Sequence, residues 1–250
     1  MRKKLIAGNW KMNSLKNEAK ALAEAVFARA TNDMPFDMLV CPPMNVLGFV
    51  AELPHSNVFV GAQDVAETPK ASGAFTGDIS AQMVKDLGAD WTLVGHSERR
   101  QYHGETNAIV KQKAENAINA GLTVVICIGE TLDERESGKA VEVVRTQTRE
   151  CVSSIANAEN CVIAYEPVWA IGTGKVPTTA DVAEIHAAVR DELAKVLGAE
   201  TADKMRILYG GSVKPENAKE LLNVDNVDGA LIGGASLKAD SFWAIAETLM

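Results

Sequence analysis

Apolar residues gather in eight short runs along the chain. The runs are Leu5–Trp10, Phe36–Cys41, Val58–Gln63, Trp91–Gly95, Thr123–Ile128, Cys161–Glu166, Arg206–Tyr209 and Val227–Ile232. The interval between their centres averages close to one eighth of the 250 residues. Most runs are continuous and do not alternate with polar residues, which is typical of strands buried on both faces of a parallel sheet. The pattern therefore predicts eight parallel strands.

Helical periodicity fills most of the gaps between these runs. One stripe steps by three and four residues through Val182, Ile185, Val189, Leu193 and Val196. This spacing places the side chains on one face of a helix. Thr178 with Asp181 resembles a capping box at its start, and Gly198 follows its end. Pro215 suits the first turn of a later helix. A last amphipathic helix is predicted from Phe242, Ile245 and Leu249.

Alternation of strand and helix predicts an α/β fold with a parallel sheet. Eight such units in 250 residues fit a closed (β/α)8 barrel, and no linker divides the chain, so we expect a single domain over residues 1–250. The rival fold is a doubly wound open sheet, which normally has a glycine-rich turn after its first strand. That turn reads GNWKMN (8–13) and lacks the GxGxxG spacing, which favours the barrel.

Charge and hydropathy narrow the class of partner. The chain has 25 basic and 33 acidic side chains, a net charge of −8, and the excess lies in residues 126–250, with 12 basic and 20 acidic groups. This balance argues against a nucleic-acid partner. The longest apolar stretch, Leu122–Ile128, is far shorter than the roughly 20 residues of a membrane-spanning helix. The start, MRKKLIAG, lacks the apolar core of a signal peptide. We expect a cytoplasmic protein without a membrane partner.

Cysteines and histidines show no pattern of a disulfide or metal site. The cysteines are Cys41, Cys127, Cys151 and Cys161. They have no CxxC or paired spacing, so reduced, mostly buried thiols are expected. The histidines are His55, His96, His103 and His186. They have no ligand spacing, so no metal is predicted. His186 lies in the helix described above and is interpreted as structural.

Polar residues and glycines mark the ends of the predicted strands. In an α/β barrel these ends meet at one face, where active sites form. The residues at the ends include Asn9 and Lys11, Gln63 and Asp64, His96 and Glu98, Gly129 and Glu130, Glu166, Gly210 to Ser212, and Gly233 with Gly234.

Glu166 ends the sixth apolar run, in the segment CVIAYEP. Apolar neighbours remove water from a carboxylate, which disfavours its charged form and raises its pKa. Such a group suits a general base that takes a weakly acidic C–H proton. The alternative is a structural ion pair at a strand end, and the motif alone leaves both interpretations open.

His96 and Lys11 are the other candidate reacting groups. A neutral imidazole at His96 could donate a hydrogen bond to a carbonyl oxygen, although a lone histidine is more often structural. The segment GHSERR (95–100) lacks both the second glycine of a hydrolase GxSxG and the cysteines of a zinc deaminase. The ammonium of Lys11 could stabilise an oxyanion, with amide help from Asn9. The alternative for Lys11 is a solvated surface lysine.

The segment after Glu166 has an apolar centre between a proline and two glycines. It consists of Pro167, Val168, Trp169, Ala170, Ile171, Gly172, Thr173, Gly174 and Lys175. A lid that closes over a substrate would explain this composition, and a loop packed on its neighbours is the alternative. It is not a Walker A motif, because tryptophan stands where glycine is required.

Two glycine-rich loops follow the seventh and eighth runs. Gly210, Gly211 and Ser212 form the first, and Gly233 with Gly234 begins the second. Glycines let backbone amides approach a ligand closely. Paired loops at these positions often bind phosphate in α/β barrels. We therefore expect a phosphate group between them.

Seven motifs then point to one family. In order they are GNWKMN (8–13), GAFTGD (73–78), GHSERR (95–100), CIGE (127–130), AYEPVWAIGTGK (164–175), YGGSV (209–213) and GGASL (233–237). They span nearly the whole chain, and together they resemble the triosephosphate isomerase family, whose fold is the TIM barrel. The resemblance implies a cofactor-free isomerase of glycolysis and gluconeogenesis that interconverts dihydroxyacetone phosphate and D-glyceraldehyde 3-phosphate through an enediolate.

The resemblance also implies a role for each candidate. Glu166 would be the base, His96 the neutral electrophile, and Lys11 with Asn9 would stabilise the oxyanion. Glu98 would be a buried partner near Lys11. The expected phosphate ligands are the backbones of Gly172, Ser212, Gly233 and Gly234. Closure of residues 167–175 would exclude water, and Tyr209 and Ser212 would contact the closed lid.

Family members are generally dimers in which the loop after the third strand enters the partner's active-site region. GAFTGD, with Thr76 at its tip, matches that loop, so a homodimer is expected. Asp64 stands where the family usually has Asn, and Asp78 where it has Glu. Both departures touch the dimer contact and leave the catalytic set unchanged.

Two alternatives stay open. One is another sugar-phosphate isomerase or epimerase on the same fold. The other is a phosphate-ligand binding protein without catalysis, which would need only the glycine loops. The presence of Glu166, His96 and Lys11 argues against simple binding.

Overall fold

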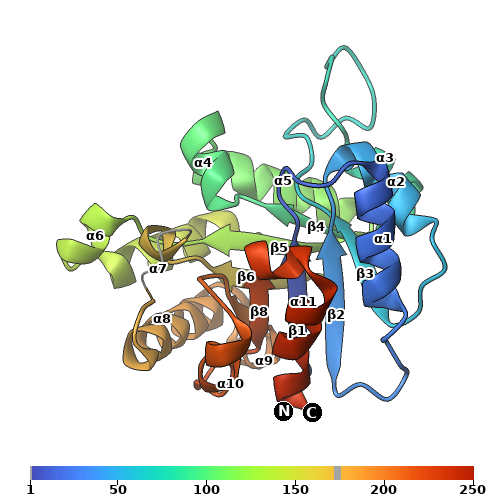
Figure 1. The fold of residues 1–250 in the computed structure, drawn as a ribbon. Coiled ribbons are helices and arrows are strands. Elements are labelled where there is room, and N and C mark those ends of the chain that lie inside the picture. Colours follow the sequence, from blue (N-terminus) through green and yellow to red (C-terminus); the bar gives the residue numbers. More distant parts are fainter. Residues whose placement is uncertain (1, 172–175) are drawn as a thin grey trace.

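The computed structural model of the protein describes residues 2–171 and 176–250. Eight strands pair in parallel and close into a barrel in the order β1 to β8 (Figure 1). Their bounds are β1 (Lys4–Asn9), β2 (Phe36–Cys41), β3 (Val58–Ala62), β4 (Trp91–Val94), β5 (Thr123–Ile128), β6 (Cys161–Tyr165), β7 (Ile207–Tyr209) and β8 (Gly229–Ile232). The second and fifth have the predicted bounds, the first is shifted by one residue at both ends, and the others differ by one or two residues at one end. The closed parallel sheet confirms the predicted α/β barrel.

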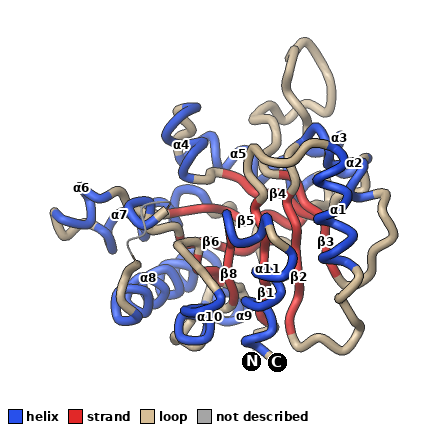
Figure 2. Tube along the Cα trace, in the orientation of Figure 1, coloured by secondary structure: helices blue, strands red, loops and turns tan. Residues whose placement is uncertain are grey.

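Helices surround the strands (Figure 2). They are α1 (Lys16–Phe27), α2 (Met44–Ala51), α3 (Ala81–Asp86), α4 (Ser97–His103), α5 (Asn107–Asn119), α6 (Leu132–Glu136), α7 (Ala140–Cys151), α8 (Thr179–Leu197), α9 (Ala199–Lys204), α10 (Pro215–Leu222) and α11 (Ala239–Ala246). Short 3₁₀ turns are η1 (Val168–Ala170), η2 (Gly234–Leu237) and η3 (Glu247–Leu249). The last predicted helix is therefore shorter than expected, because Leu249 lies in η3 and not in α11.

Apolar side chains of every strand except β3 alternate between two cores. One lies inside the barrel and includes Leu5, Ala7, Leu39, Cys127 and Ala164. The other lies between strands and helices and includes Ile6, Met38, Ile126 and Ile163. Neighbouring strand residues point to opposite faces of the sheet. Both faces of the sheet are buried here, which explains why the strand sequences are continuous apolar runs.

Local signals at the helix ends behave as the sequence predicts. Thr178 Oγ1 accepts a hydrogen bond from the amide of Asp181, and the Asp181 side chain returns to Thr178, which completes the capping box of α8. Gly198 ends that helix with φ +87°, a conformation that favours glycine. Pro215 occupies the first turn of α10. The four cysteines are free and buried, as expected. No helix among the described residues is long and apolar enough to cross a membrane.

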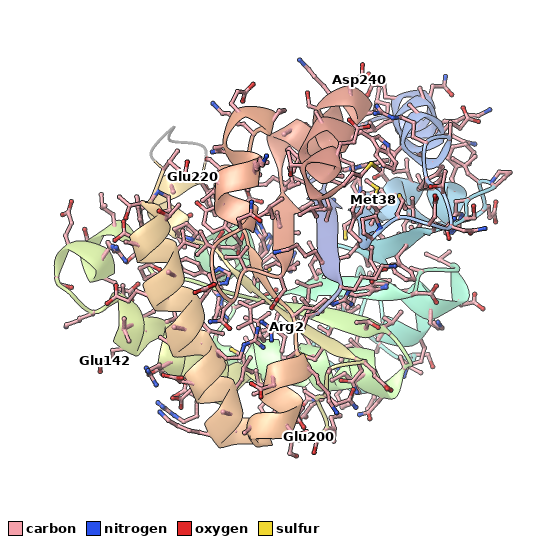
Figure 3. All side chains as sticks on the ribbon, turned by 90° about the horizontal axis from the view of Figure 1, so that it is seen from below. Arg2, Met38, Glu142, Glu200, Glu220 and Asp240 are labelled. Atoms are coloured by element: carbon pink, nitrogen blue, oxygen red, sulfur yellow. The ribbon has the colours of Figure 1, made fainter. Side chains whose placement is uncertain are left out.

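Acidic side chains of the second half lie on the outside of the barrel. Figure 3 shows Glu142, Glu200, Glu220 and Asp240 at the periphery, whereas Arg2 lies near the centre of this view. All four acidic residues are exposed. The negative charge of the chain is therefore carried largely by the helical surface and not by the barrel interior.

Candidate active site

The carboxyl ends of the strands surround a cavity of about 590 Å³. Its lining includes the four predicted polar residues Asn9, Lys11, His96 and Glu166. Both glycine loops also line it, through Gly210, Gly211, Ser212, Gly233 and Gly234. The structure thus brings together most of the residues that the strand-end rule selected, because parallel strands of a barrel all end at the same face.

Lys11 is held in an unusual backbone conformation beside the cavity. Its φ is +52°, which costs a non-glycine residue of order 1–3 kcal/mol unless its surroundings impose it. The Lys11 amide donates to Asn9 Oδ1 at 2.9 Å, and Gln63 Nε2 donates to the Lys11 carbonyl at 2.9 Å. Nζ contacts Glu98 Oε1 at 2.5 Å. Glu98 is thus the expected partner of Lys11, but it is only partly buried, with 41% of its side chain exposed.

His96 caps the start of α4 and presents one nitrogen to the cavity. Its Nδ1 accepts a hydrogen bond from the amide of Glu98 at 3.2 Å. An amide can only donate, so a neutral His96 carries its proton on Nε2. Nε2 lies 2.8 Å from Glu166 Oε1. The imidazole is therefore oriented with a donor toward the cavity, as an electrophile requires.

Glu166 is only 2% exposed, and both of its carboxylate oxygens have donors. Oε1 faces His96, and Oε2 accepts the amide of Ser97 at 3.0 Å. Burial alone raises the pKa of Glu166, but His96, the Ser97 amide and Lys11 outweigh burial and hold the pKa below its usual value. The raised pKa expected from the sequence is thus wrong for this arrangement, because the stabilising donors come from other segments.

The pKa of His96 shifts in the opposite direction. Burial disfavours the charged imidazole, yet the carboxylate of Glu166 outweighs burial and raises the pKa of His96. Each group therefore favours the charged form of the other while they are in contact. The raised pKa of His96 thus depends on its contact with Glu166, since burial by itself favours the neutral ring.

Gly210 and Gly129 leave room for Glu166 in its observed position. A Cβ at Gly210 would lie 2.9 Å from Glu166 Cγ and 3.1 Å from the carbonyl oxygen of Tyr165. A Cβ at Gly129 would lie 1.7 Å from the carbonyl oxygen of Glu166. Any side chain at either position would displace the candidate base or its backbone.

The first half of the predicted lid packs down through Trp169. Its Nε1 donates to Glu130 Oε1 at 2.8 Å, and Tyr165 Oη donates to the same oxygen at 3.0 Å. Glu130 is fully buried, and burial raises the pKa of its carboxyl although both donors partly oppose the shift. Sequence reasoning gave Glu130 no role. The sequence signal that could have indicated a role for Glu130 was its position after the fifth strand, in CIGE.

Ser212 contacts the described part of the predicted lid, and Tyr209 lies beside it. Ser212 Oγ donates to the carbonyl of Ala170 at 2.9 Å. Tyr209 Oη is buried and has no hydrogen-bond partner among the described residues. The remaining predicted lid residues, Gly172, Thr173, Gly174 and Lys175, lie outside the described residues, including the predicted phosphate ligand Gly172.

The second glycine loop lies beside Lys11. A Cβ at Gly233 would approach Lys11 Cε to 3.3 Å. Gly234 begins the turn η2, in which the Ser236 amide donates to the Gly233 carbonyl at 2.8 Å. The arrangement puts an ammonium group next to a backbone cradle, which suits an anionic ligand.

Thr76 lies in an exposed loop that projects from the barrel between β3 and α3 (Figure 1). Asp78, one of the two departures from the family pattern, ends this loop segment, whereas the other, Asp64, lies just after β3 and binds Lys113 with both oxygens, at 2.9 and 2.7 Å. Its Oδ2 is also 2.9 Å from Arg99 Nε. No group of three or more histidine, cysteine or acidic residues suited to a metal occurs in the described ranges.

Comparison with known proteins agrees with the geometry. A family model described as triosephosphate isomerase matches residues 4–249. The triosephosphate isomerase of Xanthobacter flavus is 52% identical over 252 residues, covering 99% of this chain and 98% of that protein. That of Magnetococcus marinus is 51% identical over 255 residues, covering 100% and 99%. The crystal structure of triosephosphate isomerase from Bartonella henselae has a TM-score of 0.88 and 42% identity, with 98% of each chain covered. The chain belongs to the triosephosphate isomerase family.

Proposed function

We propose that this protein interconverts dihydroxyacetone phosphate and D-glyceraldehyde 3-phosphate without a cofactor. The observation that carries the proposal is the contact between the buried Glu166 carboxylate and His96 Nε2, 2.8 Å apart, in a cavity that both glycine loops line. A base and a hydrogen-bond donor beside a phosphate cradle are the groups that aldose–ketose isomerisation of a small phosphate ester needs.

Glu166 would take a proton from the carbon next to the substrate carbonyl. The C–H electron pair becomes the C=C bond of an enediolate, and the carbonyl electrons move onto oxygen. His96 Nε2–H donates to that oxygen, and Lys11 stabilises its charge. Glu166 then returns the proton to the neighbouring carbon while His96 moves a proton between the two oxygens. The carboxylate must first leave its present donors.

Substrate phosphate would bind to the backbones of Ser212, Gly233 and Gly234, with Gly172 contributed by the lid. The glycine positions allow this close approach, and the ammonium of Lys11 adds charge complementarity. Closure of residues 167–175, with contacts from Tyr209 and Ser212, would exclude water and protect the enediolate from loss of phosphate.

A homodimer is the assembly we propose, with the Thr76 loop as its main contact. Large apolar side chains are exposed near the barrel mouth: Met12 is 95% exposed, Leu15 74% and Tyr102 72%. Exposed apolar clusters of this kind often mark protein interfaces. The four free, buried cysteines favour a reducing compartment, so we place the dimer in the cytoplasm. Sedimentation of wild type against Thr76→Arg tests the contact, and a wild-type monomer would contradict it.

The activity is tested by incubating the protein with dihydroxyacetone phosphate in D2O and following carbon-bound protons by NMR. We expect product with solvent deuterium incorporated through the enediolate. Glu166→Gln should lower kcat by about 10²–10⁴-fold with a much smaller change in substrate affinity. Glu142→Gln, on the outer surface, is the matched control. Tight binding without turnover in the wild type would favour the phosphate-binding alternative, and turnover of other sugar phosphates alone would favour a related isomerase.

A further inference from the structure

The chain after β5 runs beside the candidate base and extends the sheet. The carbonyl of Ile128 accepts the amide of Glu166 at 2.7 Å, and the carbonyl of Glu130 accepts the amide of Val168 at 3.1 Å. Gly129 lies between these two acceptors, and a Cβ on it would lie 1.7 Å from the Glu166 carbonyl oxygen. The position of the Glu166 backbone therefore depends on the position of residues 128–130.

On the other side of this extension, the neighbouring strand β4 is too short to support it. The pairing of β4 with β5 ends at Val94 and Ile126. Gly95 then turns the chain with φ +67°, and α4 begins at Ser97. The amide and carbonyl of Gly129 consequently have no strand to bond on this side. Backbone groups held away from water need such partners.

Gln147 on α7 supplies the missing peptide group. Its Oε1 accepts the Gly129 amide at 2.7 Å, and its Nε2 donates to the Gly129 carbonyl at 3.1 Å. A carboxamide has the donor and the acceptor of a backbone peptide, so one side chain satisfies both groups. Gln147 is half-buried and lines a cavity of about 400 Å³ together with Ser97, Gly129 and Glu166. This cavity leaves residues 128–130 room to shift when the two bonds are lost.

We propose that Gln147 is a positioning residue for the isomerisation, which holds Gly129 and through it the backbone of Glu166 and the start of the lid. The inference rests on the proposed function, in which Glu166 is the base. The lid is included because Glu130, next to Gly129, accepts the Trp169 indole at 2.8 Å. Gln147 is not among the described residues that line the active-site cavity, so it acts through its neighbours and not on the substrate.

Two substitutions of similar length test this role. Gln147→Met keeps the reach of the side chain and removes both hydrogen bonds. Gln147→Glu keeps an acceptor but sets a second oxygen against the Gly129 carbonyl, which repels it. In steady-state kinetics with dihydroxyacetone phosphate, both should lower kcat by up to about 100-fold, because a misplaced reacting group has an effect of this size. KM should change less, since the expected phosphate ligands lie on other loops.

The pH dependence separates positioning from a merely structural role. A proton on the introduced carboxyl restores a donor, so the kcat of Gln147→Glu relative to wild type should rise from about pH 8 to about pH 5. The relative kcat of Gln147→Met should stay level, because methionine does not titrate. A purely electrostatic effect would have the opposite sign, since the added negative charge favours protonated Glu166 and lowers the relative kcat at low pH.

Gln112→Glu is the matched control. Gln112 is also a half-buried glutamine on a helix, α5, and its Nε2 donates to Asn116 Oδ1 at 3.0 Å. This variant should keep the wild-type kcat at each pH.

Two results would overturn the inference. One is a Gln147→Met protein with the wild-type circular dichroism spectrum and the kcat of the control, in which only the urea midpoint falls. The other is a relative kcat of Gln147→Glu that does not rise toward low pH. If the wild type itself does not convert dihydroxyacetone phosphate, the proposed function fails and the inference fails with it, so the two failures are distinguishable.

Discussion

His186 leads to a quantitative prediction for stability at low pH. Its ring on α8 is fully buried, and Nδ1 donates to the Asn226 carbonyl at 3.0 Å. Nε2 has no partner among the described residues, and the ring of Tyr165 packs edge-on, with 5.8 Å between centroids. Burial lowers the pKa of His186 to about 4. A proton on Nε2 would place a charge where neither water nor an acceptor can stabilise it.

The size of the effect follows from proton linkage. In the unfolded chain the pKa of a histidine is about 6.5. Below that value the unfolded state binds a proton that folded His186 does not, so the free energy of unfolding decreases as pH falls toward the folded pKa. With about 1.4 kcal/mol per pKa unit, the loss is about 2 kcal/mol at about pH 5 and about 3 kcal/mol at about pH 4. The raised pKa of His96 has the opposite effect on stability, because protonation of His96 favours the folded state.

Urea unfolding at about pH 8 and about pH 5, at one protein concentration, measures the contribution of His186 to the free energy of unfolding. His186→Asn keeps a donor for the Asn226 carbonyl but has no ring to protonate. It loses packing at both pH values, yet its stability should fall by about 2 kcal/mol less than that of the wild type. His96 is present in both proteins, so its contribution cancels.

His55→Asn is the matched control, because His55 is exposed while its Nδ1 lies 2.7 Å from the carbonyl oxygen of Leu53. We expect it to follow the wild-type pH dependence. If His186→Asn loses as much stability as the wild type between the two pH values, the reasoning from burial is refuted.

Three further substitutions test the site and its support. Gly210→Ala would place a Cβ 2.9 Å from Glu166 Cγ, so steady-state kinetics should show kcat reduced by up to about 100-fold with an unchanged circular dichroism spectrum; full activity would argue against displacement of the base. Trp169→Phe removes the 2.8 Å hydrogen bond to Glu130. It should lower the free energy of unfolding by about 1–3 kcal/mol in a denaturant titration, and an unchanged midpoint would show that the bond contributes little. Asp228→Ala leaves two arginines without the carboxylate they share and should cost about 3–5 kcal/mol, so a loss below about 1 kcal/mol in the same assay would contradict the importance of this pair.

Much of the candidate site was predictable because of one geometric rule. Asn9 ends a buried strand and Lys11, His96 and Glu166 each follow one in the sequence, and parallel strands of a barrel end at one face. Position along the chain therefore predicted that these side chains would meet. The rule says nothing about residues that support the lid from below, and for that reason it identified Glu130 as a strand-end residue without a role.

Charge states were not predictable from the neighbours of a residue in the chain. The apolar segment around Glu166 indicates a raised pKa, but the Ser97 amide donates to its Oε2 across 69 positions of sequence. That amide, with His96 and Lys11, reverses the sign of the shift. The contact of Glu98 with Lys11 likewise joins segments that lie 87 positions apart in the sequence.

The sequence by itself determined the eight strands, the capped helix α8 and the face on which the site forms, because burial periodicity and helix caps depend on residues close together in the chain. Only the tertiary structure decided which atoms donate to Glu166 and how Gln63 holds the strained backbone of Lys11. Hydrogen bonds and ion pairs act over a few ångströms between distant segments, and no local pattern of residues specifies them.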